Sequence, residues 1–261
     1  MNQNPPDLER IRSSGLVREV EFHTEIGSTN DRAAELARQP SLDCPFLVLA
    51  ARQTAGRGRG SNRWWSAPGG LTFSLVLEAR QSGLPVERWP QIALAAGAAV
   101  CEAIEQAIPN AAVGLKWPND VYLSGKKASG ILVEAPSTGT GRLLVGIGVN
   151  VNNSFANAPA ELQPLATSMT DVARRPFDST AVLLAILARF DVCLSNLVGN
   201  QRELFERWRT RCLLSGKRVR LSSGSRRVTG VCRGIDETGR LVLVTPEGTE
   251  RHLSGTIDSF E

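Results

Sequence analysis

One short stretch, residues 53–65, limits what this chain can be more than any other, because it concentrates glycine, arginine and tryptophan. Its chemically informative residues are Gln53, Gly56, Arg57, Gly58, Arg59, Gly60, Arg63, Trp64 and Trp65. The glycines let the backbone approach a ligand closely, and each arginine carries a fork of N–H donors suited to carboxylate or phosphate. Ordering such a loop costs entropy, so we expect it to be mobile when empty and to settle on an anionic ligand. A solvated basic loop, or an arginine-glycine segment that binds RNA, is the alternative.

The totals of the chain exclude several classes of protein. Its 261 residues can bury a sizeable core, and a net charge of +4 is too mild to demand a nucleic-acid partner. Five cysteines without a CxxC pair and only two histidines argue against a disulfide framework, a zinc site or a histidine-based triad. We therefore expect reduced thiols in a cytoplasmic protein. The polar N-terminus is no signal peptide, and we expect no apolar run to reach the ~18 residues of a membrane helix.

The hydrophobic pattern predicts a large domain at 16–213 and a small β domain at 214–261, after a disordered lead-in at 1–15. In the first domain it predicts strands at 17–22, 46–51, 71–77, 113–116, 121–123, 128–134 and 143–149 and helices at 31–38, 91–108, 179–197 and 201–212. The small residues of the second helix (Ala95, Ala96, Gly97 and Ala99) favour close packing on a sheet. In the tail it predicts short alternating strands at 218–221, 227–234, 241–244 and 250–253, typical of a small barrel.

Three further groups of polar residues have both a structural and a functional interpretation. Ser28, Thr29 and Asn30 precede a predicted helix and either cap it only or also meet a polar ligand. The stretch 116–120 (Lys-Trp-Pro-Asn-Asp) is an unusual way to build a turn, and its last two residues can face a ligand or a magnesium-bound phosphate. Lys127 is either solvated or neutralises charge between a carboxylate and a phosphate. No GxxxxGK[ST] motif occurs, so a P-loop is excluded.

Five stretches in order give the chain a resemblance to the biotin protein ligases. They are Gly27-Ser28-Thr29-Asn30, Gln53-Thr54-Ala55-Gly56-Arg57-Gly58-Arg59, Lys116-Trp117-Pro118-Asn119-Asp120, Lys127-Ala128-Ser129-Gly130-Ile131-Leu132-Val133-Glu134 and Val145-Gly146-Ile147-Gly148-Val149-Asn150. The resemblance implies an α+β fold: a class II synthetase-like mixed sheet with helices, followed by a small C-terminal SH3-like β-barrel. It also implies a ligase that makes biotinyl-5′-AMP from biotin and ATP and passes the biotinyl group to a lysine of a biotin carboxyl carrier domain.

The resemblance also implies roles for individual residues. Lys127, Arg59 and Asp120 are expected to be catalytic, with Lys127 bridging the biotin carboxylate and the α-phosphate. The expected biotin-binding residues are Ser28, Thr29, Asn30, Gln53, Gly56, Arg57, Gly58, Arg59, Lys127 and Gly130. The expected nucleotide-binding residues are Arg57, Arg59, Trp64, Lys116, Asn119, Asp120 and Asn150. No metal is built in, since Mg²⁺ is expected to arrive with ATP near Asp120. Biotin itself is a substrate.

The chain departs from the family in two places. After Arg59 many members continue with Arg-Gly-Arg, whereas this chain has Gly60-Ser61-Asn62, and we expect the lower charge to alter retention of the intermediate. Bifunctional members carry an N-terminal DNA-binding domain, which the short lead-in does not match, so we expect a ligase with no DNA or membrane partner. A related lipoate or octanoate transferase is the other enzyme candidate. The sequence leaves open whether the protein is a monomer or a homodimer.

Overall fold

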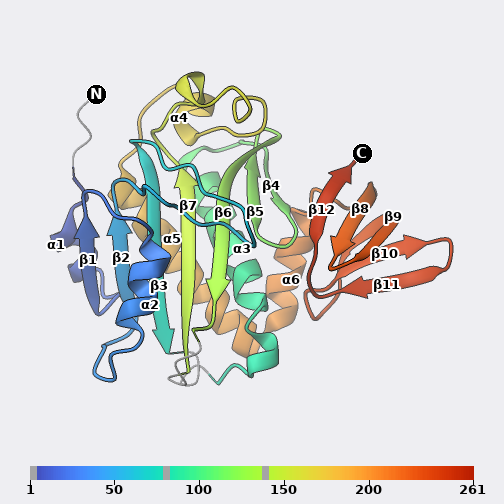
Figure 1. Cartoon of the computed structure of the whole chain (residues 1–261), viewed down its shortest axis with the longest axis horizontal. Helices are drawn as coiled ribbons and strands as arrows, with labels where there is room; N and C mark the ends of the chain where they lie inside the picture. Colours follow the sequence, from blue (N-terminus) through green and yellow to red (C-terminus); the bar gives the residue numbers. More distant parts are fainter. Residues whose placement is uncertain (1–4, 79–82, 137–140) are drawn as a thin grey trace.

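The chain folds into two β-sheets, the larger of which is flanked by helices (Figure 1). The computed structural model describes residues 5–78, 83–136 and 141–261. The first sheet has seven strands and the second, formed by the C-terminal residues, has five. This arrangement confirms the predicted α+β class, with a mixed sheet followed by a small β appendage.

The larger sheet places its strands in the order β1-β2-β3-β7-β6-β5-β4. β1 and β2 run parallel and every other neighbouring pair in this sheet is antiparallel. The strands span β1 Glu19–His23, β2 Phe46–Ala50, β3 Gly70–Glu78, β4 Val113–Lys116, β5 Asp120–Leu123, β6 Lys126–Glu134 and β7 Arg142–Asn150. β7 is central and buried along its whole length, which accounts for its nearly continuous apolar sequence.

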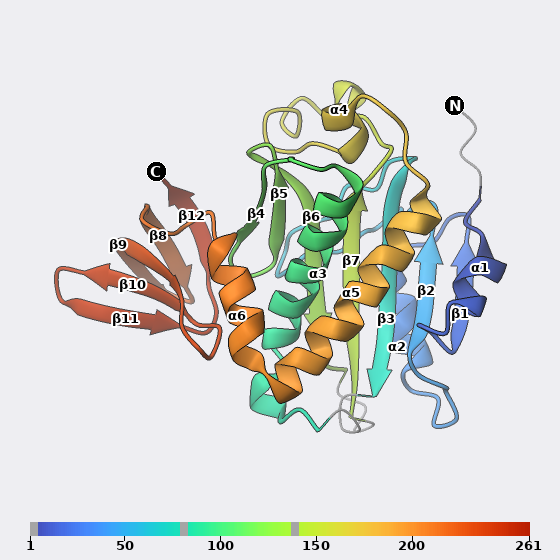
Figure 2. The same ribbon diagram turned by 180° about the vertical axis from the view of Figure 1, so that it is seen from behind.

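Helices cover the two faces of this sheet unequally. α3 (Gln91–Ala107), α5 (Ser179–Gly199) and α6 (Gln201–Thr210) lie on one face, where Figure 2 shows them in front of the strands. α2 (Thr29–Leu36) and the segment between β2 and β3 lie on the other face (Figure 1). Among the described residues, α2 is thus the one α-helix on the second face, and the polar residues singled out in the sequence gather there.

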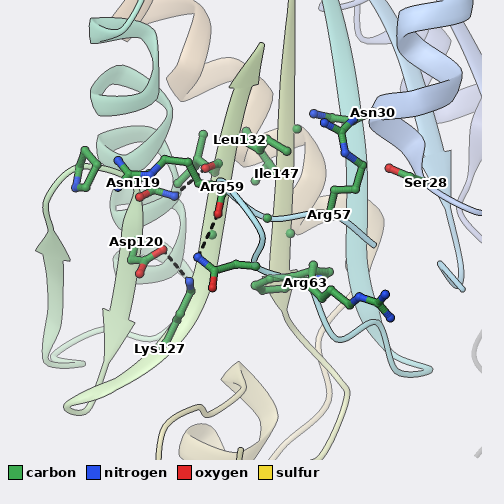
Figure 3. Close-up of a pocket in the computed structure, with 18 of the residues that line it drawn as sticks. Ser28, Asn30, Arg57, Arg59, Arg63, Asn119, Asp120, Lys127, Leu132 and Ile147 are labelled. Atoms are coloured by element: carbon green, nitrogen blue, oxygen red, sulfur yellow. Dashed lines mark hydrogen bonds and ion pairs between the residues drawn. The ribbon is translucent and has the colours of Figure 1, made fainter. Parts of the chain in front are cut away.

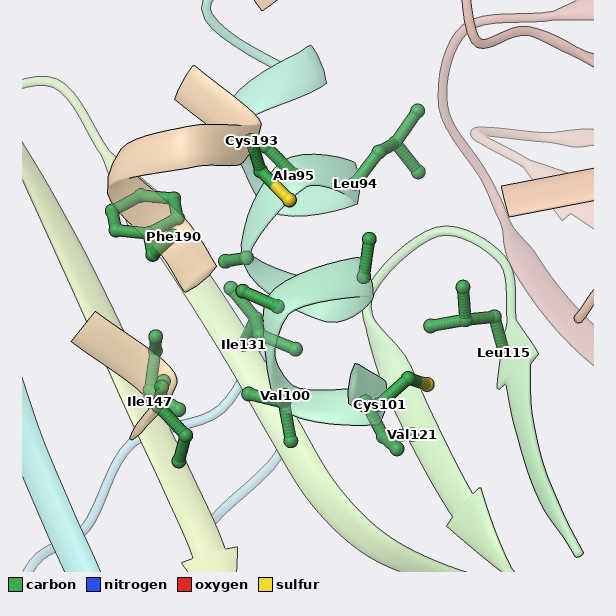
Figure 4. Packing of buried hydrophobic residues seen from close by; sticks show 14 of the residues in the cluster. Leu94, Ala95, Val100, Cys101, Leu115, Val121, Ile131, Ile147, Phe190 and Cys193 are labelled. Atoms are coloured by element: carbon green, nitrogen blue, oxygen red, sulfur yellow. The ribbon is translucent and has the colours of Figure 1, made fainter. Parts of the chain in front are cut away.

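The main hydrophobic core lies between α3, α5 and the sheet. Figure 4 shows Val100 of α3 with Leu115 of β4 and Ile131 of β6, all of them buried. A side chain at Gly97 would bring its Cβ to 3.1 Å from Leu115 Cδ2, so the small residues of α3 do permit close packing, as predicted. A second, smaller cluster, which includes Val48, packs α2 onto β2, β3 and β7.

α5 corrects one expectation from the sequence. By length and composition alone this helix could cross a membrane, although no such run was expected. In the structure one side of it, including Leu183, Ile186 and Phe190, is buried in the core against α3. α5 therefore serves as a core helix in this fold.

The predicted lead-in also needs correction. Residues 1–4 lie outside the described part of the chain, but α1 (Leu8–Ser13) is a helix within the stretch expected to be disordered. Asp7 caps it by accepting a hydrogen bond from Arg10 N at 2.9 Å, and Ile11 is fully buried. A single apolar anchor was too weak a periodic signal to predict this helix. Three more short helices, likewise not predicted, are η1 Val86–Arg88, η2 Phe155–Asn157 and α4 Met169–Ala173.

The C-terminal sheet has the order β11-β10-β9-β8-β12 and is antiparallel throughout. Its strands are β8 Arg218–Ser223, β9 Arg226–Ile235, β10 Leu241–Thr245, β11 Gly248–His252 and β12 Thr256–Phe260. The first four match the predicted alternating strands; β12 was not predicted. The sheet docks on the larger part of the molecule through polar contacts as well as apolar ones: Trp117 Nε1 donates to Gly239 O at 3.2 Å and Gln91 Nε2 to Thr238 O at 2.8 Å.

Candidate active site

A cavity of about 140 Å³ opens on the less covered face of the larger sheet (Figure 3). It brings together most of the residues selected from the sequence: Ser28, Thr29, Asn30, Gln53, Arg57, Gly58, Arg59, Trp64, Lys116, Asn119, Asp120, Lys127 and Gly130. Among the described residues, Gly56 and Asn150 are the two selected positions that do not line it. Asn150 is buried at the end of β7, where its Oδ1 accepts from Asn153 Nδ2 at 3.1 Å.

Glycines make the floor of the cavity. Gly130 on β6 faces Gly148 on β7 in register, so two neighbouring positions of the sheet have no side chain. The indole of Trp64 occupies this space: a Cβ on Gly148 would lie 2.4 Å from Trp64 Cε2, and one on Gly130 would lie 3.3 Å from Trp64 Cζ3. The close approach of the aromatic ring therefore requires a glycine at position 148 and leaves little room for a side chain at position 130.

The polar end of the cavity is organised by Gln53. The segment that contains it, residues 52–55, pairs with residues 26 and 27 beyond the end of β1, which carries Gln53 to the start of α2. Gln53 Oε1 accepts from Thr29 N at 2.7 Å and from Thr29 Oγ1 at 3.1 Å, so it caps the helix. In the described part of the chain Ser28, the N-cap residue, makes no side-chain capping bond. Of the two interpretations of this residue, structural capping by its hydroxyl is therefore excluded.

The Gly/Arg segment forms a small hairpin. Trp64 N donates to Gly56 O at 2.9 Å and Gly58 N donates to Asn62 O at 2.8 Å. Asn62 closes the turn, because its Nδ2 donates to Arg59 O at 2.9 Å. A Cβ on Gly56 would lie 2.6 Å from Trp64 O, so this glycine serves the hairpin itself and contributes nothing to the cavity wall. The turn of the hairpin is thus built from Gly60, Ser61 and Asn62, the three residues at which this chain departs from the pattern of many biotin protein ligases.

Arg57 anchors this hairpin to the body of the molecule. Its Nη1 donates to Asp31 Oδ1 at 2.7 Å and its Nη2 bonds Glu134 Oε1. Burial lowers the pKa of Arg57, but the two carboxylates outweigh it and leave the pKa raised. Glu134 also accepts from Asn30 Nδ2 at 2.9 Å through its other oxygen. The charge of Arg57 is therefore already matched by two acidic side chains.

The opposite end of the cavity is cationic, and its positive charges outnumber the carboxylates beside them. Lys127 Nζ lies 2.6 Å from Asp120 Oδ1, and Arg59 and Lys116 line the same space. Burial lowers the pKa of Arg59 and of Lys116, with Asp120 opposing the shift in both cases. Three cations thus surround one carboxylate, and Figure 3 shows Ser28 and Asn30 on the far side of the cavity from Lys127 and Asp120. An excess of partly buried positive charge of this kind suits a polyanion.

The side chains at the cationic end fit a magnesium ion that arrives with phosphate. Within the described residues no group of three or more His, Cys, Asp or Glu could hold a metal. Mg²⁺ commonly takes one or two carboxylates and completes its coordination with water and substrate phosphates. Asp120 supplies a carboxylate, and the amide of the adjacent Asn119 is fixed in the wall by donation to Ile131 O at 2.8 Å.

Several lining residues were not among the expected site residues, although some of them lie in the recognised motifs: Asn62, Arg63, Phe73, Trp117, Pro118, Ile131, Leu132, Gly146, Ile147, Gly148, Thr256 and Ile257. Gly146 and Gly148 carried a usable signal, since two alternate glycines in an apolar strand indicate close approach of another group. A Cβ on Gly146 would lie 2.1 Å from Asn30 Oδ1. Thr256 and Ile257 carried none, because they come from β12 in the other sheet.

Comparison with known families gives a consistent assignment for both sheets. Residues 24–152 match the Biotin/lipoate A/B protein ligase family, and residues 214–258 match the Biotin protein ligase C terminal domain. The two matches between them include every selected residue.

Individual relatives extend over nearly the whole chain. It is 35% identical over 249 residues to the biotin–[acetyl-CoA-carboxylase] ligase of Mycobacterium tuberculosis, covering 92% of this chain and 90% of that protein. It is 34% identical to the bifunctional ligase/repressor BirA of Bacillus subtilis, covering 91% of this chain and 73% of that one.

A solved structure supports the same assignment. The biotin protein ligase from Aquifex aeolicus, in complex with biotin and ATP, superimposes with a TM-score of 0.80 at 33% identity. The match covers 94% of this chain and 99% of that chain, so both sheets and the segment between them are shared. This chain belongs to the biotin protein ligase family.

Proposed function

We propose that this protein activates biotin with ATP and attaches it to a lysine of a biotin carboxyl carrier domain. One observation carries the proposal: a single cavity joins an uncharged hydrogen-bonding end, at Ser28, Thr29 and Gln53, to a cationic end at Lys116 and Lys127. The uncharged end suits the ureido ring of biotin. The cationic end suits the biotin carboxylate and a triphosphate, which repel each other and must be brought together.

The first step joins these two anions. A carboxylate oxygen of biotin attacks the α-phosphorus of ATP, the bond to the bridging oxygen breaks, and pyrophosphate leaves. In this proposal Lys127 neutralises charge between the carboxylate and the α-phosphate, and Arg59 and Lys116 neutralise charge on the nucleotide. Asp120 holds Lys127 in place and offers the carboxylate for the Mg²⁺ that accompanies ATP, which supplies further positive charge.

The second step transfers the biotinyl group. The ε-amine of the acceptor lysine attacks the acyl carbon of the mixed anhydride, the bond to the AMP oxygen breaks, and the amine loses a proton to solvent. The hairpin that bears Arg57 and Arg59 also keeps water away from the mixed anhydride, because an anhydride exposed to water would hydrolyse. Trp64, which lies on the glycine floor, is our candidate for the adenine-stacking residue.

The two alternatives from the sequence are less well supported. A lipoate or octanoate transferase would account for the shared sheet but not for the match of residues 214–258 to a biotin protein ligase domain. RNA binding would use an exposed array of arginine and tryptophan. In this structure Arg57 is paired with two carboxylates and Trp64 lies inside the cavity, so neither is presented to a strand of RNA.

The cellular setting follows from the chemistry. All five cysteines are free, with Cys101, Cys193 and Cys232 buried, as expected in a reducing compartment. Together with the use of ATP, this supports our assignment of the protein to the cytoplasm, where its partner is the carrier domain of a carboxylase.

Mass spectrometry tests the proposed function directly. The protein is incubated with ATP, Mg²⁺, biotin and an isolated biotin carboxyl carrier domain, and the carrier is weighed. We expect the mass of one biotinyl group to be added, and omission of either ATP or biotin to abolish it. A carrier that gains no biotinyl group but gains an octanoyl or lipoyl group when either acid replaces biotin would overturn the assignment.

A further inference from the structure

The last strand of the chain, β12, forms part of the active-site wall. Thr256 and Ile257, at its start, line the cavity together with residues of the larger sheet. In both views β12 is the strand of the C-terminal sheet nearest to β4 (Figures 1 and 2). The C-terminal sheet is therefore not a separate module that only follows the catalytic part, because its edge strand helps to enclose the substrate.

The beginning of β12 holds Arg59. Arg59 Nη2 donates to the carbonyl oxygen of Gly255 and lies 3.3 Å from Thr256 Oγ1. The guanidinium fork is rigid, so fixing one of its nitrogens sets the direction of the others. Arg59 is half-buried and burial lowers its pKa; of its two contacts, the one to Gly255 is partly buried and the one to Thr256 is exposed.

The end of β12 holds Lys116. The Phe260 ring has its centroid 5.6 Å from Lys116 Nζ and 4.8 Å from Lys217 Nζ. The electron-rich face of the ring attracts an ammonium and limits where a flexible lysine can point. Two cations of the cavity, one on the hairpin and one on β4, are thus held by opposite ends of the same five-residue strand.

We propose that β12 positions the nucleotide end of the active site, with Thr256 and Phe260 as the positioning residues for Arg59 and Lys116. The proposal rests on the proposed function and deepens it. A C-terminal sheet that only docked the carrier domain would affect transfer alone. A positioning strand also affects the first step, in which the carrier takes no part.

Biotin-dependent exchange of labelled pyrophosphate into ATP, measured without carrier, tests this assignment. We expect Thr256→Val to raise the KM for ATP about tenfold, the scale of a lost hydrogen bond to a charged group. We expect Phe260→Leu to raise it about fivefold. Thr256→Ser and Phe260→Tyr keep the hydroxyl and the ring, so both should restore values close to the wild type. Ser259→Ala, on the same strand and exposed, is the matched control.

Thermal unfolding and calorimetric biotin binding without ATP check that the variants remain folded, and both should match the wild type. Wild-type KM values for ATP in Thr256→Val and Phe260→Leu would overturn the positioning role, whether or not transfer to the carrier is slowed. Absence of exchange in the wild-type protein is a separate result: it would overturn the proposed function, and the role of β12 with it.

Discussion

Lys127 Nζ lies 2.6 Å from Asp120 Oδ1, across the antiparallel pair of β5 and β6. The lysine side chain also passes the bare position of Gly130, where a Cβ would lie 3.4 Å from Lys127 Cε. A flexible ammonium is thus held in one direction before any substrate binds. Pre-organised charge of this kind is more effective than charge that must reorient during the reaction.

Replacing Lys127 should therefore abolish adenylate formation without unfolding the protein. We expect Lys127→Ala to slow biotin-dependent pyrophosphate exchange by at least about 10²-fold, because the charge that bridges two anions is lost. Its side chain is 34% exposed, so the midpoint of thermal unfolding should change little. Lys126→Ala is the matched control, since that lysine is exposed and contacts only the carbonyl of Gln163 in the described chain. Normal exchange in Lys127→Ala would refute the bridging role.

Arg59 should control escape of the intermediate. Its guanidinium links the hairpin to the C-terminal strand, so Arg59→Ala removes the tie that keeps the hairpin over the cavity. We expect the rate at which biotinyl-5′-AMP dissociates to rise about tenfold, measured by rapid dilution of the preloaded enzyme. Arg52→Ala, whose side chain bonds Glu25 outside the cavity, should release the intermediate at the wild-type rate. Equal release rates in both variants would count against closure by Arg59.

Glu134 should act on biotin binding through Arg57 and Asn30. Its carboxylate bonds both residues, so Glu134→Gln weakens the anchor of the hairpin and the support of the polar end at once. We expect the Kd for biotin to rise several-fold, by titration calorimetry. A double-mutant cycle with Arg57→Ala should return a coupling energy of about 1 kcal/mol, because Arg57 keeps Asp31 as a second partner. Full additivity of the two substitutions would show that the contact carries no energy.

Lys116 should set an alkaline limit on the use of ATP. Burial lowers its pKa below the ordinary value of 10.5, with Asp120 opposing the shift. The protonated form attracts phosphate, so kcat/KM for ATP should be highest near neutral pH and fall as the pH rises through this lowered pKa. In Lys116→Arg the guanidinium stays charged, so the fall should move to higher pH. An unchanged profile in that variant would assign the titration to another group.

Much of the fold followed from the sequence because the signals were local. The continuous apolar run of β7 and the small-residue helix α3 each indicated a buried element, and both are found within two residues of the predicted ends. The candidate site followed from the motifs that brought Gln53, Arg59 and Lys127 to attention. Their assembly in one cavity rests on strand order, which a motif does not encode.

What the sequence did not predict depends on contacts between distant segments. Thr256 reaches the cavity only because the C-terminal sheet docks beside β4, and nothing in a short polar strand indicates that placement. Asn150 differs in the opposite way: its motif was recognised, but its side chain accepts a hydrogen bond from Asn153 and does not line the cavity. The capping role of Gln53 was likewise hidden, since it joins residues on two separate elements.

Gly148 should be essential because Trp64 occupies the place of its missing side chain. A Cβ there would lie 2.4 Å from Trp64 Cε2, so Gly148→Ala must push the indole off the floor. We expect the KM for ATP in pyrophosphate exchange to rise about tenfold, the scale of a lost base-stacking contact. Gly199→Ala is the control, because among the described residues a Cβ there would meet nothing within 4 Å.

The double variant separates displacement of Trp64 from other damage at Gly148. If the alanine methyl acts by moving the indole, then Gly148→Ala should have almost no further effect once Trp64 is alanine, so the two substitutions should be strongly non-additive. Penalties that simply add would mean that the methyl blocks the ligand directly, and the stacking role of Trp64 would then have to be abandoned.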